Sequence, residues 1–381
     1  MFENQNALLK KNLANIPGWQ TNRKIVVIES DDWGCVRMPS REVYEKLLKE
    51  GIRVDKCPYN RYDSLASEED LTSLFEVLVK FKDKNGNHPI ITANTVVANP
   101  DFAKIQASGF LKYYYEPFTE TLQRYPNHKK AFELWNQGIT NKMFFPQFHG
   151  REHLNVHRWL NQLQKGTKET RYTFSLGLFG ISTDITTEDR KSYMAALDFE
   201  NYEEIKWQKN MLAEGIDMFE RIFKYKPSSF IATNYTWHSE LETTLAERGI
   251  HFIQSAGYQI EPNISGIKVK RHFIGQRNKL KQIYLTRNCI FEPSLNNNID
   301  SVSACIKEIK MAFFWQKPAI ISSHRLNYIG FIDENNRKKN LKGLKVLLKR
   351  ILHSWPDVEF FTTSNLGNII RDKLTGNDGG D

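Results

Sequence analysis

The stretch that decides the fold is Lys24-Ile-Val-Val-Ile28, which runs directly into Glu29-Ser-Asp-Asp-Trp-Gly34. A short apolar run rich in β-branched residues is typical of a strand buried on both faces, as in parallel sheets. Adjacent residues at a strand end point in opposite directions. One of the carboxylates, Asp31 or Asp32, could therefore bind a metal ion while the other reaches water on that ion. A turn and helix cap rich in Asp and Gly is the alternative for this dipeptide.

Further short apolar runs alternate along the chain with stretches of helical periodicity. The expected strands are 24–28, 89–93, 144–148, 172–176, 229–233, 251–255, 319–323 and 358–362. The expected helices are 68–81, 156–164, 203–223, 240–248, 299–315 and 339–354. This alternation predicts a mostly parallel sheet covered by helices. About eight such units favour a closed or nearly closed β/α barrel, whose chemistry lies at the carboxyl ends of the strands.

The alternation spans residues 20–365 and predicts one domain. Residues 1–19 are expected to form an N-terminal extension, and residues 366–381 a C-terminal tail. Two stretches break the pattern and are expected to be insertions. Residues 102–138 are aromatic and loop-rich, whereas residues 267–291 alternate in the manner of a β-hairpin.

The composition, with 40% hydrophobic and 25% charged residues among 381, is that of a soluble globular protein. The net charge of +9 suits an anionic partner: a nucleic acid, a phospholipid surface, or an acidic or diphosphate-linked substrate. The chain has no recognisable nucleic-acid-binding motif, so that partner is not expected. The basic segment 337–350 is interpreted as the solvated face of an amphipathic helix, with peripheral contact with a membrane as the alternative.

The four cysteines form no C-x-x-C pair, so a structural zinc knuckle is not expected, and free thiols fit a reducing compartment. The first residues lack the charged start and apolar core of a secretory signal. No apolar run approaches the length of a membrane span. We therefore expect a cytoplasmic protein, with contact with the inner membrane face left open.

A second motif, His149-Gly-Arg-Glu-His153, follows the expected strand 144–148. Residues four apart on a helical turn share a face, so two imidazoles could bind one ion. His157 would lie farther around such a helix and is expected to stay outside the ligand set. Surface or core histidines are the alternative. A protease-type H-x-x-E-H site using Glu152 is another, but it would leave the aspartate pair without a role.

A third segment, Ile320-Ile-Ser-Ser-His324, ends another expected strand in a histidine. A histidine at such a position is a natural general acid, because its pKa lies near neutrality. A structural histidine bonded to the backbone is the alternative. Together the three segments offer a metal-ligand set with a separate acid and base, the groups that metal-assisted hydrolysis needs.

The order Asp-Asp, then H-x-x-x-H, then a late strand ending in His resembles the polysaccharide deacetylase superfamily, the NodB-homology carbohydrate esterases. The resemblance covers roughly residues 20–365 and implies a distorted β/α barrel with loop and hairpin insertions. It implies that Asp31 is the catalytic base and His324 the late catalytic histidine. It implies a divalent ion held by Asp32, His149 and His153, with zinc expected and cobalt or nickel as alternatives.

The chain also departs from the family's pattern. Trp33 stands where the family usually has glycine after the second aspartate, and no segment matches the family's fourth, Asp- and Trp-bearing motif. Residues 227–235 stand where the family carries its arginine-proline segment, but they contain no arginine. Arg271, Arg277 and Arg325 are the candidates to replace it.

The function that the resemblance implies is metal-dependent removal of N- or O-acetyl groups from a carbohydrate. The substrate would be an acetylated glycan or its biosynthetic precursor, and a nucleotide- or lipid-linked sugar would suit the positive charge. An amidase acting on a non-sugar substrate is one alternative. A catalytically altered relative that binds or assembles glycans is the other.

Overall fold

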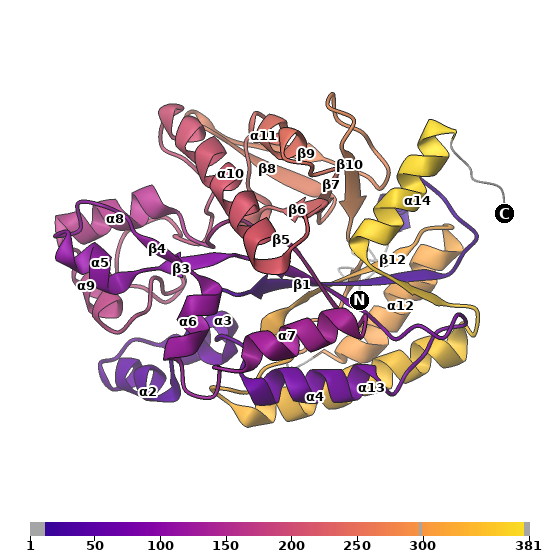
Figure 1. Ribbon diagram of the computed structural model, residues 1–381, viewed down its shortest axis with the longest axis horizontal. Helices are drawn as coiled ribbons and strands as arrows, with labels where there is room; N and C mark the ends of the chain where they lie inside the picture. Colours follow the sequence, from indigo (N-terminus) through magenta and orange to yellow (C-terminus); the bar gives the residue numbers. More distant parts are fainter. Residues whose placement is uncertain (1–11, 297–298, 377–381) are drawn as a thin grey trace, which may run out of the picture.

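A mostly parallel sheet with helices around it forms the centre of the protein (Figure 1). The computed structural model describes residues 12–296 and 299–376. The strand order is β10-β7-β6-β5-β2-β1-β12-β11, and β13 pairs with β1 beside this path. All pairings of this sheet are parallel. The strands are β1 (Ile25–Trp33), β2 (Ile91–Thr95), β5 (Phe144–Phe148), β6 (Ser229–Ile231), β7 (Phe252–Ser255), β10 (Ile283–Thr286), β11 (Cys289–Ile290), β12 (Ala319–His324) and β13 (Glu359–Phe361).

Helices surround the sheet, which confirms the expected α/β class. In Figure 1, α4, α7, α12 and α13 lie together on one side of the sheet, and α10 and α11 lie on the other. The helices are α2 (Arg41–Lys49), α3 (Pro58–Tyr62), α4 (Glu68–Leu78), α5 (Phe102–Ala107), α6 (Phe118–Arg124), α7 (Ala131–Thr140), α8 (Val156–Lys165), α9 (Lys168–Ser175), α10 (Glu203–Phe223), α11 (Leu241–Glu247), α12 (Ser301–Phe314), α13 (Glu334–Ser354) and α14 (Thr363–Thr375). Short 3-10 turns are η1 (Val54–Lys56), η2 (Thr233–Tyr235) and η3 (Arg325–Asn327).

The two faces of β1 pack into different parts of the core. Val26 and Ile28 join the large cluster formed with the outer helices. Ile25 and Val27 join a smaller cluster with apolar residues of β7, β10, β12 and α14. Because side chains alternate along a strand, Glu29 continues the face of Ile25 and Val27. This inner face is thus apolar at its start and polar at its carboxyl end, where a site can form.

The two ends of the strand order are joined by a very short link. β10 pairs with β7, and β11 pairs with β12, so consecutive strands lie at opposite ends of the order. The link is Arg287 and Asn288: the Arg287 amide donates to Ser255 O at 2.8 Å, and the Asn288 amide donates to Ile320 O at 3.1 Å. Among the described residues no strand pairing closes the sheet. The chain itself bridges the two edges, and we call residues 286–290 the seam.

One expected strand is wrong. Tyr172–Leu176 was expected to be extended, but it lies in α9 and its C-cap. The buried residues of this helix, Thr170, Thr173 and Phe174, follow a spacing of three and four, and Phe174 packs against Trp159 at 5.6 Å between ring centroids. An apolar stretch of only five residues is compatible with the periodicity of a strand and with that of a helix. Tertiary packing selects the helix here.

The stretch 102–138 is less loop-rich than expected, because it contains α5, α6 and α7. Helix α7 packs on α4 and β5 and belongs to the helical layer. The same stretch also supplies β4 (Tyr115–Pro117), which pairs antiparallel with β3 (Ala98–Pro100). The aromatic residues here therefore serve mainly as core around Trp135 and Phe118.

The expected hairpin over 267–291 is shifted. The hairpin consists of β8 (Tyr258–Asn263) and β9 (Gly266–Arg271), whereas Ile283 and Leu285 return to the central sheet in β10. The start of the expected C-terminal tail is also structured, because residues 366–375 belong to α14. Of the expected extension and tail, residues 1–11 and 377–381 lie outside the described residues.

The basic segment 337–350 lies within α13, and its leucines are buried. They pack with α12 and α4, so the apolar face of this helix is used inside the protein. Of the helices in 12–296 and 299–376, none has both the length and the apolar character that crossing a bilayer requires.

Candidate metal and catalytic site

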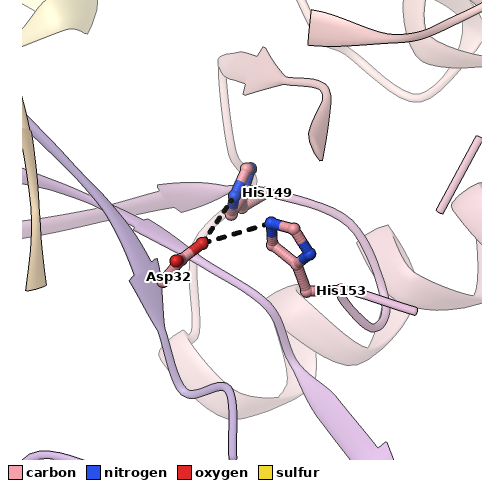
Figure 2. Close-up of side chains that lie close together, drawn as sticks. All are labelled: Asp32, His149 and His153. Carbon is pink, nitrogen blue, oxygen red and sulfur yellow. Dashed lines mark ion pairs between the residues drawn. The ribbon is translucent and has the colours of Figure 1, made fainter. Parts of the chain in front are cut away.

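Three side chains from β1 and the loop after β5 meet at the carboxyl edge of the sheet (Figure 2). Asp32 Oδ1 lies 3.4 Å from His149 Nε2 and 3.3 Å from His153 Nε2. One potential ligand atom from each residue lies within 4.8 Å of the other two, and all three residues are buried. The structure thus brings together the three residues expected to hold a metal ion.

The donor atoms of this cluster fit a divalent cation. Asp32 Oδ1 and His149 Nε2, which face each other at 3.4 Å, are buried and have no hydrogen-bond partner in the described part of the chain. His149 Nδ1 donates to Ile231 O at 2.9 Å, which leaves Nε2 with its lone pair directed at Asp32. Burial lowers the pKa of His153 well below its usual value and so keeps this imidazole neutral. Two imidazoles and a carboxylate are ligands that zinc and similar ions prefer.

Asp32 is ionised and aimed by its surroundings. Burial works to raise the pKa of this carboxyl, but Arg37 and the neighbouring histidines together outweigh it and hold the pKa well below the usual value. Arg37 Nη2 donates to Asp32 Oδ2 at 3.0 Å, which leaves Oδ1 for the histidines. The pairing of β1 with β2 shifts register between Ser30 and Trp33, and Asp32 has a φ of 72°. This irregularity re-aims the second aspartate out of the regular strand alternation.

The residues around the aspartate pair explain the turn. Gly34 has a φ of 80°, and a Cβ at this position would lie 2.3 Å from Val96 O. Trp33, which departs from the family's pattern, is 1% exposed and packs against Phe144 at 4.7 Å between centroids. It therefore anchors the turn in the core instead of facing the site.

The H-x-x-x-H segment is not helical, contrary to the sequence-based expectation. Residues 149–155 form a loop, and α8 begins only at Val156 with Asn155 as its N-cap. The loop is held because Arg151 O accepts from the Val97 and Ala98 amides. The two imidazoles therefore converge through loop geometry, not through helical spacing.

The neighbouring acid and histidine have other partners. Glu152 accepts from Arg151 Nε at 2.6 Å and takes no part in the metal-ligand cluster. Arg151 in turn lies 4.0 Å from the Tyr115 ring centroid. His157 points to Glu204, with Nδ1 at 3.7 Å, and its side chain is 42% exposed. His157 lies outside the cluster, as expected.

Asp31 lies beside the metal cluster but has a different set of partners. Its Oδ1 accepts from Asn94 Nδ2 at 2.7 Å and from Arg287 Nη2 at 2.6 Å. Its Oδ2 accepts from Arg287 Nη1 at 2.7 Å. Burial opposes ionisation, but the bidentate arginine outweighs it and holds the pKa of Asp31 far below the usual value. The same guanidinium donates from Nε to Glu29 Oε2 at 2.6 Å.

The arginine that pairs with the expected base is thus Arg287, and none of the three candidates named from the sequence. Arg325 is fully buried but donates to Asp63 and to Cys35 O. Arg271 ends β9, and Arg277 bridges to Ile283. The sequence does carry a signal for Arg287. Side chains alternate between the two faces of a strand, so position 287, two residues beyond Leu285, continues the inner face of β10. The expected hairpin over 267–291 hid that signal.

His324 completes the site from the end of β12. Its Nδ1 lies 2.6 Å from Glu292 Oε1, and its Nε2 lies 3.8 Å from Asp31 Oδ2. Burial works to lower the pKa of His324, but Glu292 and Asp31 outweigh it and raise the pKa to about 9. The Tyr59 hydroxyl lies 3.4 Å from His324 Nε2. Neither Glu292 nor Tyr59 was singled out from the sequence, because neither belongs to a recognisable motif.

The segment expected to correspond to the arginine-proline motif still contributes to the site. Ile231 O fixes the His149 tautomer, and the Tyr235 hydroxyl accepts from Arg287 Nη1 at 3.1 Å. Two residues of this segment therefore lie at the site, and the arginine that pairs with Asp31 comes from the seam.

No protein-family profile matches this sequence, and no curated protein does. Among solved structures, a chain described as a polysaccharide deacetylase from Mycobacterium smegmatis aligns over 94% of both chains, with 11% identity and a TM-score of 0.45. One so described from Pseudomonas aeruginosa PAO1 covers 91% of each chain, with 9% identity and a TM-score of 0.44. Puue allantoinase covers 92% of this chain and 93% of its own, with 10% identity and a TM-score of 0.45. The function is therefore argued from the residues of the site.

Proposed function

We propose that this protein is a metal-dependent hydrolase that removes N- or O-acetyl groups from a carbohydrate, as a divergent member of the polysaccharide deacetylase superfamily. The observation that carries the proposal is the buried cluster of Asp32, His149 and His153, in which the facing atoms Asp32 Oδ1 and His149 Nε2 lack hydrogen-bond partners within the described residues. Such atoms are costly to bury unless a cation binds them. We propose zinc as this ion, with cobalt or nickel as alternatives.

A divalent ion bound there would supply Lewis acidity towards an acyl oxygen and would lower the pKa of water near the site. The chain's own residues then supply the proton transfers. Asp31 is ionised and would accept a proton from the attacking water. Arg287 fixes both oxygens of this carboxylate, which orients it, although the lowered pKa makes it a weaker base.

His324 is suited to the opposite role. With its pKa raised to about 9, it is protonated at neutral pH and can donate to a leaving nitrogen or oxygen. Glu292 holds its Nδ1, so Nε2 faces the space next to Asp31 Oδ2. An ionised carboxylate and a protonated imidazole 3.8 Å apart form an acid–base pair across one reaction centre.

The buried Arg287–Asp31 pair favours an enzyme over a glycan-binding relative that has lost activity. A binding surface has no need of a desolvated carboxylate held by a bidentate arginine, because burying such a pair costs several kcal/mol per ion unless the geometry compensates it. The acid, the base and the metal ligands are all retained in contact.

Elemental analysis of the purified protein and of His153→Ala provides the test, combined with acetate release from acetylated sugars. We expect about one equivalent of metal per chain in the parent protein and its loss in the variant. His157→Ala is the matched control, because this histidine lies outside the cluster and should leave the metal content unchanged. Metal-free parent protein after reconstitution with zinc, cobalt and nickel would refute the proposal.

A further inference from the structure

A cavity opens along the seam; Arg287 belongs to its lining, whereas Asp31 and Asp32 do not. Its volume is about 860 Å³, within the roughly 300–1,000 Å³ that is usual for small-molecule sites. Its walls include the seam, the base of the β8–β9 hairpin and residues 13–17. Two hydrogen bonds fix the N-terminal wall: the Trp19 amide donates to Ile274 O at 2.8 Å, and Asn288 Nδ2 donates to Asn15 Oδ1 at 3.0 Å.

The inner end of this cavity is polar, and Arg287 links it to the carboxylate of Asp31. Arg287, Tyr235 and Ser322 line it. Arg287 Nη1 donates to the Tyr235 hydroxyl at 3.1 Å and to Ser322 Oγ at 3.2 Å, and the same nitrogen donates to Asp31 at 2.7 Å. A ligand that hydrogen-bonds to this cluster would therefore lie one side chain away from Asp31.

The inner end offers hydrogen bonds but little free positive charge. The guanidinium of Arg287 already pairs with both Glu29 and Asp31 at 2.6 Å. Two carboxylates on one guanidinium leave no excess positive charge to attract a phosphate. The chemistry here suits the hydroxyl groups of an uncharged sugar ring better than a diphosphate.

The exposed part of the cavity lining carries three large apolar side chains beside Arg271. These are Leu13, Phe273 and Ile290, which form the rim and are 54%, 40% and 48% exposed. The cavity therefore runs from a polar end, formed by Arg287, Tyr235 and Ser322, to a mouth that carries exposed apolar side chains. A ligand that matches both ends has a polar head and an apolar chain.

We propose that this cavity binds an amphiphilic glycoside, with the sugar at Arg287, Tyr235 and Ser322 and the alkyl chain at Leu13, Phe273 and Ile290. The inference rests on the proposed function and narrows its substrate class to sugars that carry an apolar aglycone. Continuity between the cavity and the candidate catalytic cluster through Arg287 supports this occupant over one unrelated to the reaction.

Calorimetric titration with methyl, hexyl, heptyl and octyl β-glucosides, each below its micelle concentration, tests the proposal. We expect affinity to rise about fourfold for each added methylene, the value for transferring a CH₂ group out of water. Phe273→Asp and, independently, Leu13→Asp should flatten this dependence, since both place a charge on the exposed rim. Leu111→Asp is the matched control, because Leu111 is 74% exposed and lies away from the cavity lining.

Tyr235→Phe distinguishes the contribution of the sugar head group to affinity from that of the alkyl chain. It removes one hydroxyl from the inner end, so all glucosides should bind more weakly by a similar factor while the dependence on chain length remains. Affinity independent of chain length would overturn the proposal, as would a dependence that persists in both rim variants. A dimer detected by sedimentation and dispersed by Phe273→Asp would assign the rim to a second copy and overturn it too.

The binding test is independent of turnover. Chain-length-dependent binding without acetate release from any acetylated sugar would support the amphiphile site and count against the proposed function. Acetate release from short acetylated sugars without chain-length-dependent binding would do the reverse.

Discussion

Asp31 and Asp32 are neighbours in the chain, yet their surroundings differ in a way that fits the two roles proposed for them. Asp31 accepts hydrogen bonds at both oxygens, from Asn94 and from both terminal nitrogens of Arg287. Within the described residues, Asp32 accepts from Arg37 at one oxygen, and its other oxygen faces the imidazoles of His149 and His153. A carboxylate saturated with donors has little capacity left for a cation, whereas a half-satisfied one beside histidines is well suited to it.

The comparison shows that the two neighbouring carboxylates are paired with two different arginines. Each aspartate has its own buried arginine, and the arginines come from different parts of the chain. Arg37 follows β1 directly, while Arg287 lies at the seam. The protein thus holds two carboxylates ionised side by side in a buried region, where they would otherwise raise each other's pKa.

Substituting Asp31 and Asp32 one at a time should give the largest expected effects, on turnover and on metal content. Asp32→Asn should abolish metal binding and turnover together. Asp31→Asn should keep the metal while lowering kcat by about 10²–10⁴-fold, the usual contribution of a positioned base. Metal content and acetate release, measured on both variants, check this contrast. Loss of metal in Asp31→Asn with retention in Asp32→Asn would reverse the assignment.

The arginine of the seam has the next largest effect, on stability. Arg287→Met leaves Glu29 and Asp31 buried without a counter-charge and should lower the free energy of unfolding by about 3–5 kcal/mol. Arg23→Met is the matched control, since the Arg23 side chain is 44% exposed and its pair with Glu359 should contribute about 1 kcal/mol or less. Urea denaturation measures both.

A double-variant cycle sharpens this result. Glu29→Gln in the Arg287→Met background removes one of the two stranded carboxylates and should restore part of the lost stability. Equal losses of unfolding free energy in Arg287→Met and Arg23→Met would show that the buried ion pair of Arg287 stabilises the protein no more than an exposed one.

The residues proposed as metal ligands, base and acid could be named from the sequence because each signal is local. An apolar run ending in Asp31-Asp32, a pair of histidines after the strand that ends at Phe148, and a strand ending in His324 all lie within single short windows. The parallel sheet then requires these ends to meet at one edge. The sequence did not predict the loop that carries the two histidines, because spacing of four also fits a helix.

The supporting residues could not be named, because long-range geometry brings them in. Arg287 reaches Asp31 only because the chain changes partner from β7 to β12 within two residues, and no local pattern announces this change. Glu292 and Tyr59 reach His324 from the segments after β11 and within α3. In the sequence, each of these three residues is an ordinary polar residue among its neighbours. Only the folded structure brings it next to Asp31 or His324.

The pH dependence separates the acid from the base. Because the pKa of His324 is raised to about 9, kcat should be constant near neutrality and fall as the pH rises through about 9, where the imidazolium loses its proton. Any stability that this raised pKa contributes is likewise present below the ordinary value of 6.5 and lost as the pH rises through 9. Glu292→Gln removes a cause of the raised pKa and should move the alkaline limb to lower pH. A limb unmoved by this variant would exclude His324 as the titrating acid.

The smallest expected effect is that of Tyr59, which lies between the two halves of the site. Its hydroxyl is 3.4 Å from His324 Nε2, and the Arg37 guanidinium lies 5.7 Å from its ring centroid. Tyr59→Phe keeps the ring and removes the hydroxyl, so it should cost about 0.5–1.5 kcal/mol, or roughly two- to tenfold in kcat. Metal content should not change, because the ring that contacts Arg37 remains. Parallel measurement of kcat and metal content decides the point: a loss of metal in Tyr59→Phe would place Tyr59 with Asp32 instead of with His324.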